Sequence, residues 1–340
     1  MSQEARLSVL MSVRNGEPYL ANAIDSVLGQ TEGRFRFLIV NDGSTDNSAA
    51  MLDRFARQDR RIRIYHRENQ GLVASLNFLL EQADTPLIAR MDADDISLPE
   101  RFARQMAFLD VNPDISVLGT NNHELDEQGR FRVNRHCYPE THDDICTALL
   151  SCNPISHPTT MMRRDAMLAM NGYRAQFRHC EDYDLWLRLS QHYRLANLPD
   201  RLLLYRRSPG QVTERHNFAS SLGSAYALLA ARERLAGRPD PFAGMTALPP
   251  IDALDGLTGQ PGMGQAMRTE IIDRVKYSRS ALADPALKLM VEHLHSGGEP
   301  LDLWRTAGRM VKLGLAGQAT RLALALLRHA HPPSLRAGPV

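Results

Sequence analysis

Three carboxylates stand close together at Asp92, Asp94 and Asp95, just after the apolar run 86–89. A short apolar run predicts a buried strand, and carboxylates at its end repel one another and resist leaving water. A divalent cation that prefers oxygen ligands, such as Mg²⁺ or Mn²⁺, relieves both problems. Residues i and i+2 of an extended segment project to the same side, so Asp92 and Asp94 are expected to share one ion or ligand. Asp95 is expected to point elsewhere.

The same triplet has a structural alternative, because Asp95 or Ser97 could cap a helix that begins in the capping-box sequence 97–100. A second acidic turn weighs against that alternative. Asp42 follows another apolar run, 35–40, although by itself it is an ordinary turn residue. Ligands of α/β sheets bind beyond the carboxyl ends of the strands, where both acidic turns are expected. Their coincidence favours a binding site.

A second pair of carboxylates, Glu181 and Asp182, opens a helix predicted over 181–191. A carboxylate within hydrogen-bond reach of a hydroxyl can take its proton as the hydroxyl attacks, which makes Asp182 a candidate general base. Glu181 could orient the substrate or complete the helix cap. The structural alternative is that the helix dipole favours acidic residues in the first turn.

Two weaker candidates are a histidine and an arginine. His157 precedes Pro158 and could face a substrate, although a lone histidine is more often structural. Arg206, beside Arg207, could contact a diphosphate because guanidinium binds phosphate well, or it could be a solvated surface residue.

The elements that must position these residues alternate between strands and helices up to residue 120. This βαβα alternation predicts an α/β fold with a mostly parallel sheet flanked by helices. The predicted strands are 7–13, 35–40, 62–66, 86–91 and 115–120, and the predicted helices are 18–28, 46–59, 72–82 and 97–109. The later pattern predicts a hairpin over 121–133, a helix over 141–150, and short strands at 159–163, 193–197 and 202–206.

Composition limits the kinds of partner and compartment. Hydrophobic residues make up 43% of the 340 residues, and the net charge is +1 without a long run of like charge, so no nucleic-acid partner is expected. The four cysteines form no C-x-x-C pair, so a zinc site is not expected and scattered thiols suit a reducing cytoplasm. The polar start and the lack of an apolar run near ~20 residues indicate a cytoplasmic protein, peripheral to the cell membrane at most.

Composition changes after residue 215, which predicts two regions, 1–215 and 216–340. The second region is predicted to be helical, with a Pro/Gly-rich loop over 237–264. Residues 301–328 carry an apolar stripe together with several cations. This pattern is typical of helices packed on a main domain, and its alternative is a basic amphipathic surface resting on the inner face of a membrane.

Five segments occur in an order that resembles a known family. They are "LSVLMSVRNGEPYLANAIDSVLGQT", "FLIVNDGSTDNS", "ARMDADDISLPERFARQ", "NPISHPTTMMRRDAM" and "HCEDYDLWLRL". Together, over about residues 5–215, they resemble a family 2 glycosyltransferase of the GT-A fold, of the type that builds bacterial surface polysaccharides. The resemblance implies a metal-dependent, inverting transfer of one sugar from a nucleotide-sugar, expected to be a UDP-sugar, to a hydroxyl of a glycan or lipid-linked acceptor.

The resemblance also implies roles for single residues. Asp42 matches the residue that receives the nucleotide base, with Asn41 beside it where many relatives carry another Asp. Asp92 and Asp94 match the D-x-D pair, the first near the ribose and the second on the metal. Asp182 matches the catalytic base.

The first strand departs from the family pattern. It ends in Ser12-Val13-Arg14-Asn15, where many relatives carry Pro-x-Tyr-Asn. Val13 and Asn15 therefore match nucleotide-contacting positions, while the stacking ring of those relatives is missing.

Three alternative functions differ from this one in the motifs that they require. The segment 211–215 lacks the spacing and the Trp of the Q-x-x-R-W motif of processive relatives, which favours a single addition. A sugar nucleotidyltransferase would need an early Gly-rich basic loop, which residues 12–18 lack. A non-catalytic sugar-nucleotide-binding protein is the third possibility, and the complete set of Asp92, Asp94 and Asp182 argues against it.

Overall fold

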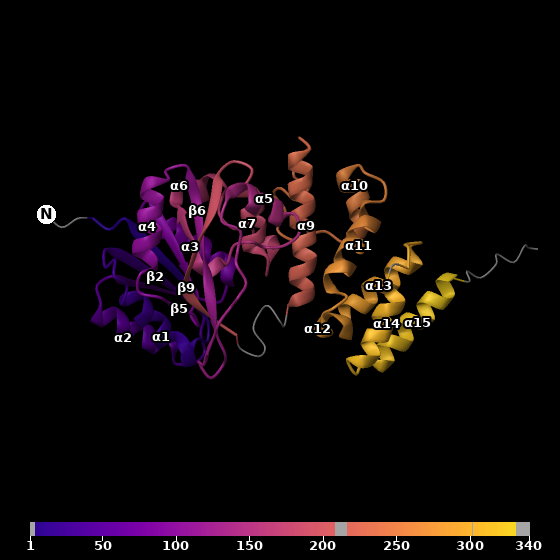
Figure 1. Ribbon diagram of the computed structural model, residues 1–340, viewed down its shortest axis with the longest axis horizontal. Helices are drawn as coiled ribbons and strands as arrows, with labels where there is room; N and C mark the ends of the chain where they lie inside the picture. Colours follow the sequence, from indigo (N-terminus) through magenta and orange to yellow (C-terminus); the bar gives the residue numbers. More distant parts are fainter. Residues whose placement is uncertain (1–3, 208–215, 301, 331–340) are drawn as a thin grey trace, which may run out of the picture. The chain divides into compact units, whose positions relative to one another are not determined.

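The computed structural model describes residues 4–207, 216–300 and 302–330, and it divides into two compact units (Figure 1). The sheet unit comprises Met1–Ala175 and Glu181–Pro209, and the helical unit comprises Gln176–Cys180 and Gly210–Val340. The segment 211–215 and the predicted boundary at its end lie outside the described residues.

The sheet unit is built on nine strands in the order β3-β2-β1-β4-β8-β6-β9-β5, with β7 paired to β6. The first four strands of this order run parallel, and β6 runs parallel to β9, whereas β8 is antiparallel to both neighbours. The predicted α/β fold with a mostly parallel sheet is therefore confirmed. The strands are β1 Leu7–Val13, β2 Phe35–Asp42, β3 Ile62–Arg67, β4 Leu87–Met91, β5 Ile96–Ser97, β6 Ile115–Leu125, β7 Phe131–Arg132, β8 Met161–Arg163 and β9 Arg194–Arg206.

Helices cover both faces of the parallel strands. Alternate residues of β1, such as Val9 and Met11, join one core cluster with buried residues of α1, α2 and α4. The α3 helix contacts β1 and β2 through residues that lie outside this cluster, which places it on the opposite face. The helices of the sheet unit are α1 Glu17–Leu28, α2 Ser48–Gln58, α3 Leu72–Gln82, α4 Arg101–Val111, α5 His142–Leu149, α6 Arg164–Ala169 and α7 Glu181–Leu189.

The predicted capping box at 97–100 is wrong. Ser97 lies in β5, which pairs with β9, and its hydroxyl accepts a hydrogen bond from Gln30 Nε2 at 3.1 Å. The α4 helix begins at Arg101, and Glu100 at its N-cap makes no side-chain capping bond. Pairing with a strand about a hundred residues away thus overrides the local capping signal. Ser97 therefore does not cap α4, which removes this explanation of the acidic triplet.

Two strands, β6 and β9, are longer than their local patterns predict, whereas β8 is shorter than the strand predicted at 159–163. The two strands predicted at 193–197 and 202–206 form one strand, β9, which pairs with β6 along nearly its whole length. Register shifts near Asn121 interrupt the regular pairing of β6 with β9. The predicted hairpin over 121–133 is formed by the end of β6 and by β7.

The helical unit contains the predicted helices, but the predicted loop over 237–264 is partly helical. Asp255 in α10 accepts hydrogen bonds from the backbone N–H groups of Gly262 and Gly264, which ties α10 to the start of α11. The helices are α9 Asn217–Leu235, α10 Leu254–Thr258, α11 Met263–Val275, α12 Arg279–Ala283, α13 Pro285–His295, α14 Leu303–Lys312 and α15 Ala316–Ala330. Within the described ranges, no helix has both the length and the apolar character needed to cross a bilayer.

Candidate active site

The two acidic turns lie at one edge of the sheet, as the sequence predicts. In the register of the parallel strands, Val13 at the end of β1 lies beside Asn41 of β2, and Met11 lies beside Met91 at the end of β4. Asp42 and the loop that begins at Asp92 therefore leave the sheet at the same edge, on either side of β1.

Asp42 is held by the two residues that directly precede α3. Its side chain is buried, with 3% exposure, and its two carboxylate oxygens accept hydrogen bonds from the backbone N–H groups of Gln70 at 2.8 Å and Gly71 at 2.9 Å. Each carboxylate oxygen has a second lone pair, so this carboxylate can accept a further hydrogen bond from a ligand.

Asn41 and Asn15 shape the turn that follows β2. Asn41 Oδ1 accepts a hydrogen bond from the N–H of Ser44 at 3.1 Å, and Asn15 Oδ1 accepts one from the N–H of Thr45 at 2.8 Å. Asn15 adopts a left-handed φ of 54°, a conformation that Asn tolerates better than most residues. The side chain of Val13 is fully buried in the core, so only its backbone could contact a nucleotide.

Arg90 is a buried arginine that local sequence patterns do not single out, and it binds the acidic loop. Arg90 has 2% exposure, and its guanidinium donates hydrogen bonds to Asp92 Oδ1 at 2.6 Å and to the carbonyl of Met91. Burial opposes the charge of Arg90, but the field of Asp92 raises its pKa, and Glu181 acts in the same direction. Arg90 in turn stabilises the ionised form of Asp182. Arg90 therefore binds the acidic loop directly, and its charge also acts on the carboxylates at the start of α7.

The acidic loop carries more negative charge than its protein neighbours compensate. Burial and then the charge of Asp92 raise the pKa of Asp94 to about 6. Asp95 is 1% exposed, and burial, Asp92 and Asp94 raise its pKa well above the ordinary value. Asp95 Oδ1 accepts a hydrogen bond from the N–H of Arg206, and Oδ2 is buried without a partner.

This donor set fits a hard divalent cation. In the part of the chain that the structure describes, no three His, Cys, Asp or Glu side chains are grouped closely enough to hold a metal ion by themselves. Mg²⁺ is usually bound by one or two carboxylates together with substrate phosphates and water, so the Asp92–Asp94 pair suffices when a diphosphate completes the site.

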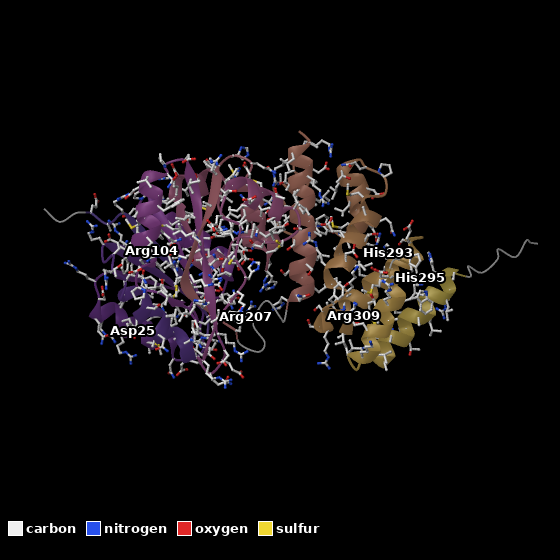
Figure 2. All side chains as sticks on the ribbon, in the orientation of Figure 1. Asp25, Arg104, Arg207, His293, His295 and Arg309 are labelled. Carbon is white, nitrogen blue, oxygen red and sulfur yellow. The ribbon has the colours of Figure 1, made fainter. Side chains whose placement is uncertain are left out.

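Arg206 is a buried residue rather than a solvated one. Its Nε donates a hydrogen bond to the carbonyl of Asp94 at 2.8 Å, and its guanidinium carbon lies 4.1 Å from the centre of the Tyr19 ring. Arg206 therefore holds the backbone of the acidic loop. The neighbouring Arg207, labelled in Figure 2, is exposed and pairs with Glu124 at 2.9 Å.

Asp182 lies in the first turn of α7 and is held by a second residue that the sequence analysis missed. Asn153 Nδ2 donates a hydrogen bond to Asp182 Oδ2 at 2.7 Å, and the N–H of Tyr183 donates one to Oδ1 at 2.8 Å. Burial raises the pKa of Asp182, and these two hydrogen bonds oppose the rise. The segment that begins at Asn153 is one of the five that resemble the family, but no local spacing connects Asn153 to a residue 29 positions later.

His157 and Glu181, the two other acceptor-side candidates, are both buried. His157 is buried, its Nε2 is 2.8 Å from the hydroxyl of Tyr173, and its ring also contacts Trp186. Burial and then the charge of Arg90 lower the pKa of His157 well below its ordinary value, so the ring is neutral. Glu181 is buried at the start of α7. The structure thus buries His157 against Tyr173 and Trp186.

The family model for glycosyl transferase family 2 matches residues 8–168. The O-antigen biosynthesis glycosyltransferase WbnJ of Escherichia coli is 36% identical over 204 residues, which cover 59% of this chain and 79% of WbnJ. The amylovoran biosynthesis glycosyltransferase AmsE of Erwinia amylovora is 33% identical over 215 residues, which cover 62% of this chain and 80% of AmsE. This chain belongs to glycosyltransferase family 2. It is therefore a glycosyltransferase, as its motifs predict.

Solved structures of other glycosyltransferases share its fold. S. aureus TarS 1–349 in complex with UDP-GlcNAc matches with a TM-score of 0.58 at 14% identity, over 96% of this chain and 91% of that chain. The mannosyltransferase PcManGT from Pyrobaculum calidifontis, in complex with GDP-Man and Mn²⁺, matches with a TM-score of 0.51 at 14% identity, over 97% and 88%. At these identities the likeness shows the fold alone, and the predicted GT-A architecture of this glycosyltransferase is confirmed.

Proposed function

We propose that this family 2 glycosyltransferase moves one sugar, with inversion and with the help of Mg²⁺ or Mn²⁺, from a UDP-sugar to a hydroxyl of a glycan or lipid-linked acceptor. The observation that carries the proposal is that Arg90 donates a hydrogen bond to Asp92, while its charge also favours the ionised form of Asp182, which burial opposes. Donor-side and acceptor-side carboxylates thereby belong to one site. The names of WbnJ and AmsE support a place in surface-polysaccharide synthesis, and scattered cysteines suit the cytoplasm.

On the donor side, each carboxylate has a separate task. Asp42 accepts a hydrogen bond from the imide of the base, and the turn held by Asn41 and Asn15 forms the wall beside it. Asp92 lies near the ribose, and Asp94 is the metal ligand. The metal, when bound, neutralises the charge that develops on the departing nucleoside diphosphate. UDP-GlcNAc in TarS and GDP-Man with Mn²⁺ in PcManGT support a nucleotide-sugar donor.

On the acceptor side, Asp182 takes the proton of the attacking hydroxyl. One base suffices for a one-step inverting displacement, because the proton leaves as the new bond forms. Asn153 fixes the rotamer of Asp182 and keeps its carboxylate ionised through the hydrogen bond to Oδ2. Glu181, beside the base, orients the acceptor.

A panel of nucleotide-sugars with Mn²⁺, Mg²⁺ or EDTA tests the proposal by measuring release of the nucleoside diphosphate. We expect UDP release from one UDP-sugar, dependent on the metal and stimulated by acceptor. Release of pyrophosphate from a nucleoside triphosphate and a sugar phosphate would instead indicate a nucleotidyltransferase. Donor binding without any turnover over the whole panel and a range of acceptor glycans would favour a non-catalytic binding protein.

A further inference from the structure

We propose that the α14–α15 hairpin is a docking surface for the anionic headgroups of a lipid bilayer. Charge is the first observation. The 28-residue segment 303–330 contains no Asp or Glu, in a chain whose 40 Lys and Arg are nearly balanced by 39 Asp and Glu. Its cations are Arg305, Arg309, Lys312, Arg321 and Arg328, of which Arg305 lies 3.6 Å from Asp302 at the N-cap of α14.

The α14 helix separates its residues cleanly by face. Leu303, Thr306, Ala307 and Met310 are buried, and they follow the i, i+3, i+4, i+7 spacing of a packed face. The opposite face is exposed and carries large apolar side chains next to cations. Its exposed members include Trp304 at 51% exposure, Val311 at 57%, Arg305 and Lys312.

The α15 helix repeats this arrangement. Ala319, Leu322, Ala325 and Leu326 are its buried face, and α15 packs against α14 and α13. Its exposed face carries Leu324, Leu327, Arg321 and Arg328. Large apolar residues and cations on one solvent-facing side are the pattern by which amphipathic helices lie in a bilayer interface.

A third helix end contributes to this surface. The guanidinium carbon of Arg309, labelled in Figure 2, lies 4.1 Å from the centre of the Tyr277 ring, and Arg309 donates a hydrogen bond to the carbonyl of Lys276. Tyr277 is 66% exposed. Trp and Tyr are enriched at the level of lipid headgroups, where a ring can be half apolar and half hydrated.

Charge complementarity favours an anionic bilayer over other partners for the exposed face of the α14–α15 hairpin. A second copy of the same surface would bring five cations against five, which is unfavourable, and a nucleic acid would gain little from exposed leucines. Anionic headgroups pair with the cations while Trp304, Val311, Leu324 and Leu327 enter the acyl boundary. This membrane surface is independent of the proposed sugar transfer, and its test measures vesicle binding and not transferase activity.

Co-sedimentation of the full chain with vesicles tests the proposal. One vesicle contains phosphatidylcholine alone, and the other contains phosphatidylglycerol at about one third of its lipid. We expect binding to the second vesicle only, weakened by added salt because screening shortens the reach of surface charges. The double variant Arg305→Glu/Lys312→Glu should weaken binding at least about tenfold, and Trp304→Ser should weaken it as well.

Matched controls come from exposed residues of the sheet unit. Arg57→Glu/Arg60→Glu makes the same change of charge, and Val111→Ser, at a position with 76% exposure, makes a comparable apolar change; both should bind like the parent chain. If the α14 variant fails to fold, Arg321→Glu/Arg328→Glu on α15 replaces it. Three results would each overturn the proposal. They are equal binding to neutral vesicles, vesicle binding that the hairpin variants leave unchanged, and a dimer that these variants dissociate.

Discussion

The three carboxylates of the acidic loop, Asp92, Asp94 and Asp95, differ in the hydrogen bonds that they accept. Asp92 accepts a hydrogen bond from Arg90, and Asp95 accepts one from the backbone of Arg206. Asp94 contributes its carbonyl to Arg206, and burial beside Asp92 raises the pKa of its carboxyl to about 6. Asp92 and Asp95 each already accept one of these hydrogen bonds, so Asp94 is the carboxylate to which we assign the metal.

Replacing Asp94 by Ala is expected to abolish the Mn²⁺-dependent part of donor binding, because the proposed metal ligand is removed. Calorimetric titration with UDP, with and without Mn²⁺, measures this part directly. Asp25→Ala, at an exposed position of α1, is the control and should bind like the parent chain. Mn²⁺-dependent binding that survives in the Asp94 variant would contradict the assigned role.

Replacing Asp182 by Asn should leave donor binding intact and reduce kcat by about 10²- to 10⁴-fold, the range that general base catalysis contributes. The side chain keeps its size but can no longer take a proton. Steady-state kinetics with acceptor and calorimetry with UDP separate the two effects. Normal turnover in this variant would show that another group is the base.

The pH profile of kcat/KM should report the raised pKa of Asp182. Only the ionised base is active, so activity falls as pH falls through this pKa, and the acid limb should lie above the value of ~3.9 for an ordinary Asp. Asn153→Ala removes a hydrogen bond that stabilises the carboxylate and should move the limb to still higher pH. Asn112→Ala, at the end of α4, is the control. If the acid limb of the pH profile stays at the same pH in the Asn153 variant, Asn153 has a structural role only.

At the scale of elements, a buried ion-pair network sets the position of α7 and hence of its first turn. Asp184 is completely buried and accepts hydrogen bonds from Arg174 Nε at 3.0 Å and Arg188 Nε at 2.9 Å. Arg188 also donates to the carbonyls of Met170 and Gly172, which connects α7 to the end of α6.

Asp184→Ala should therefore lower the free energy of unfolding by about 3–5 kcal/mol, because the buried guanidinium of Arg188 and the partly buried one of Arg174 lose their counter-charge. Activity should fall with it, since Asp182 is on the same helix. Denaturant unfolding measures the loss, with Asp25→Ala as the exposed-carboxylate control. A loss below about 1 kcal/mol, which is typical of a surface pair, would mean that the network does not hold α7.

At the scale of the whole molecule, the helical unit includes a short segment, Gln176–Cys180, that directly precedes α7. Within this unit, Phe177 is buried with its ring centre 6.3 Å from that of Phe242, and Gln176 Nε2 donates a hydrogen bond to the carbonyl of Phe242. Cys180 is so close to Gly223 that a Cβ there would lie 2.5 Å from its sulfur.

Removing residues 216–340 should therefore lower Tm and expose the chain near Phe177 to protease, because a buried aromatic side chain loses its partners. Thermal unfolding and limited proteolysis measure both effects. A truncated chain with the Tm of the full chain would instead support the boundary predicted after residue 215.

Much of the site could be expected from local pattern. Hydrophobic periodicity places Asp42 and the Asp92–Asp95 loop at the carboxyl ends of neighbouring strands, and the register of β1, β2 and β4 confirms this. Periodicity suffices here because parallel strands joined by helices must end at the same edge of the sheet. The start of α4 was predicted wrongly, because the sequence motif of a capping box does not reveal that Ser97 pairs in a strand.

The amino-acid order by itself therefore established the family, the sheet edge and the acidic residues, since these depend on short motifs and on strand and helix periods. The bond from the buried Arg90 to Asp92 and the bond from Asn153 to Asp182 became apparent only in the folded chain. The physical reason is that burial and pairing of a charge depend on which distant segments surround it. A local pattern predicts where a carboxylate leaves the sheet, but the packing of the folded chain determines which cation or donor meets it.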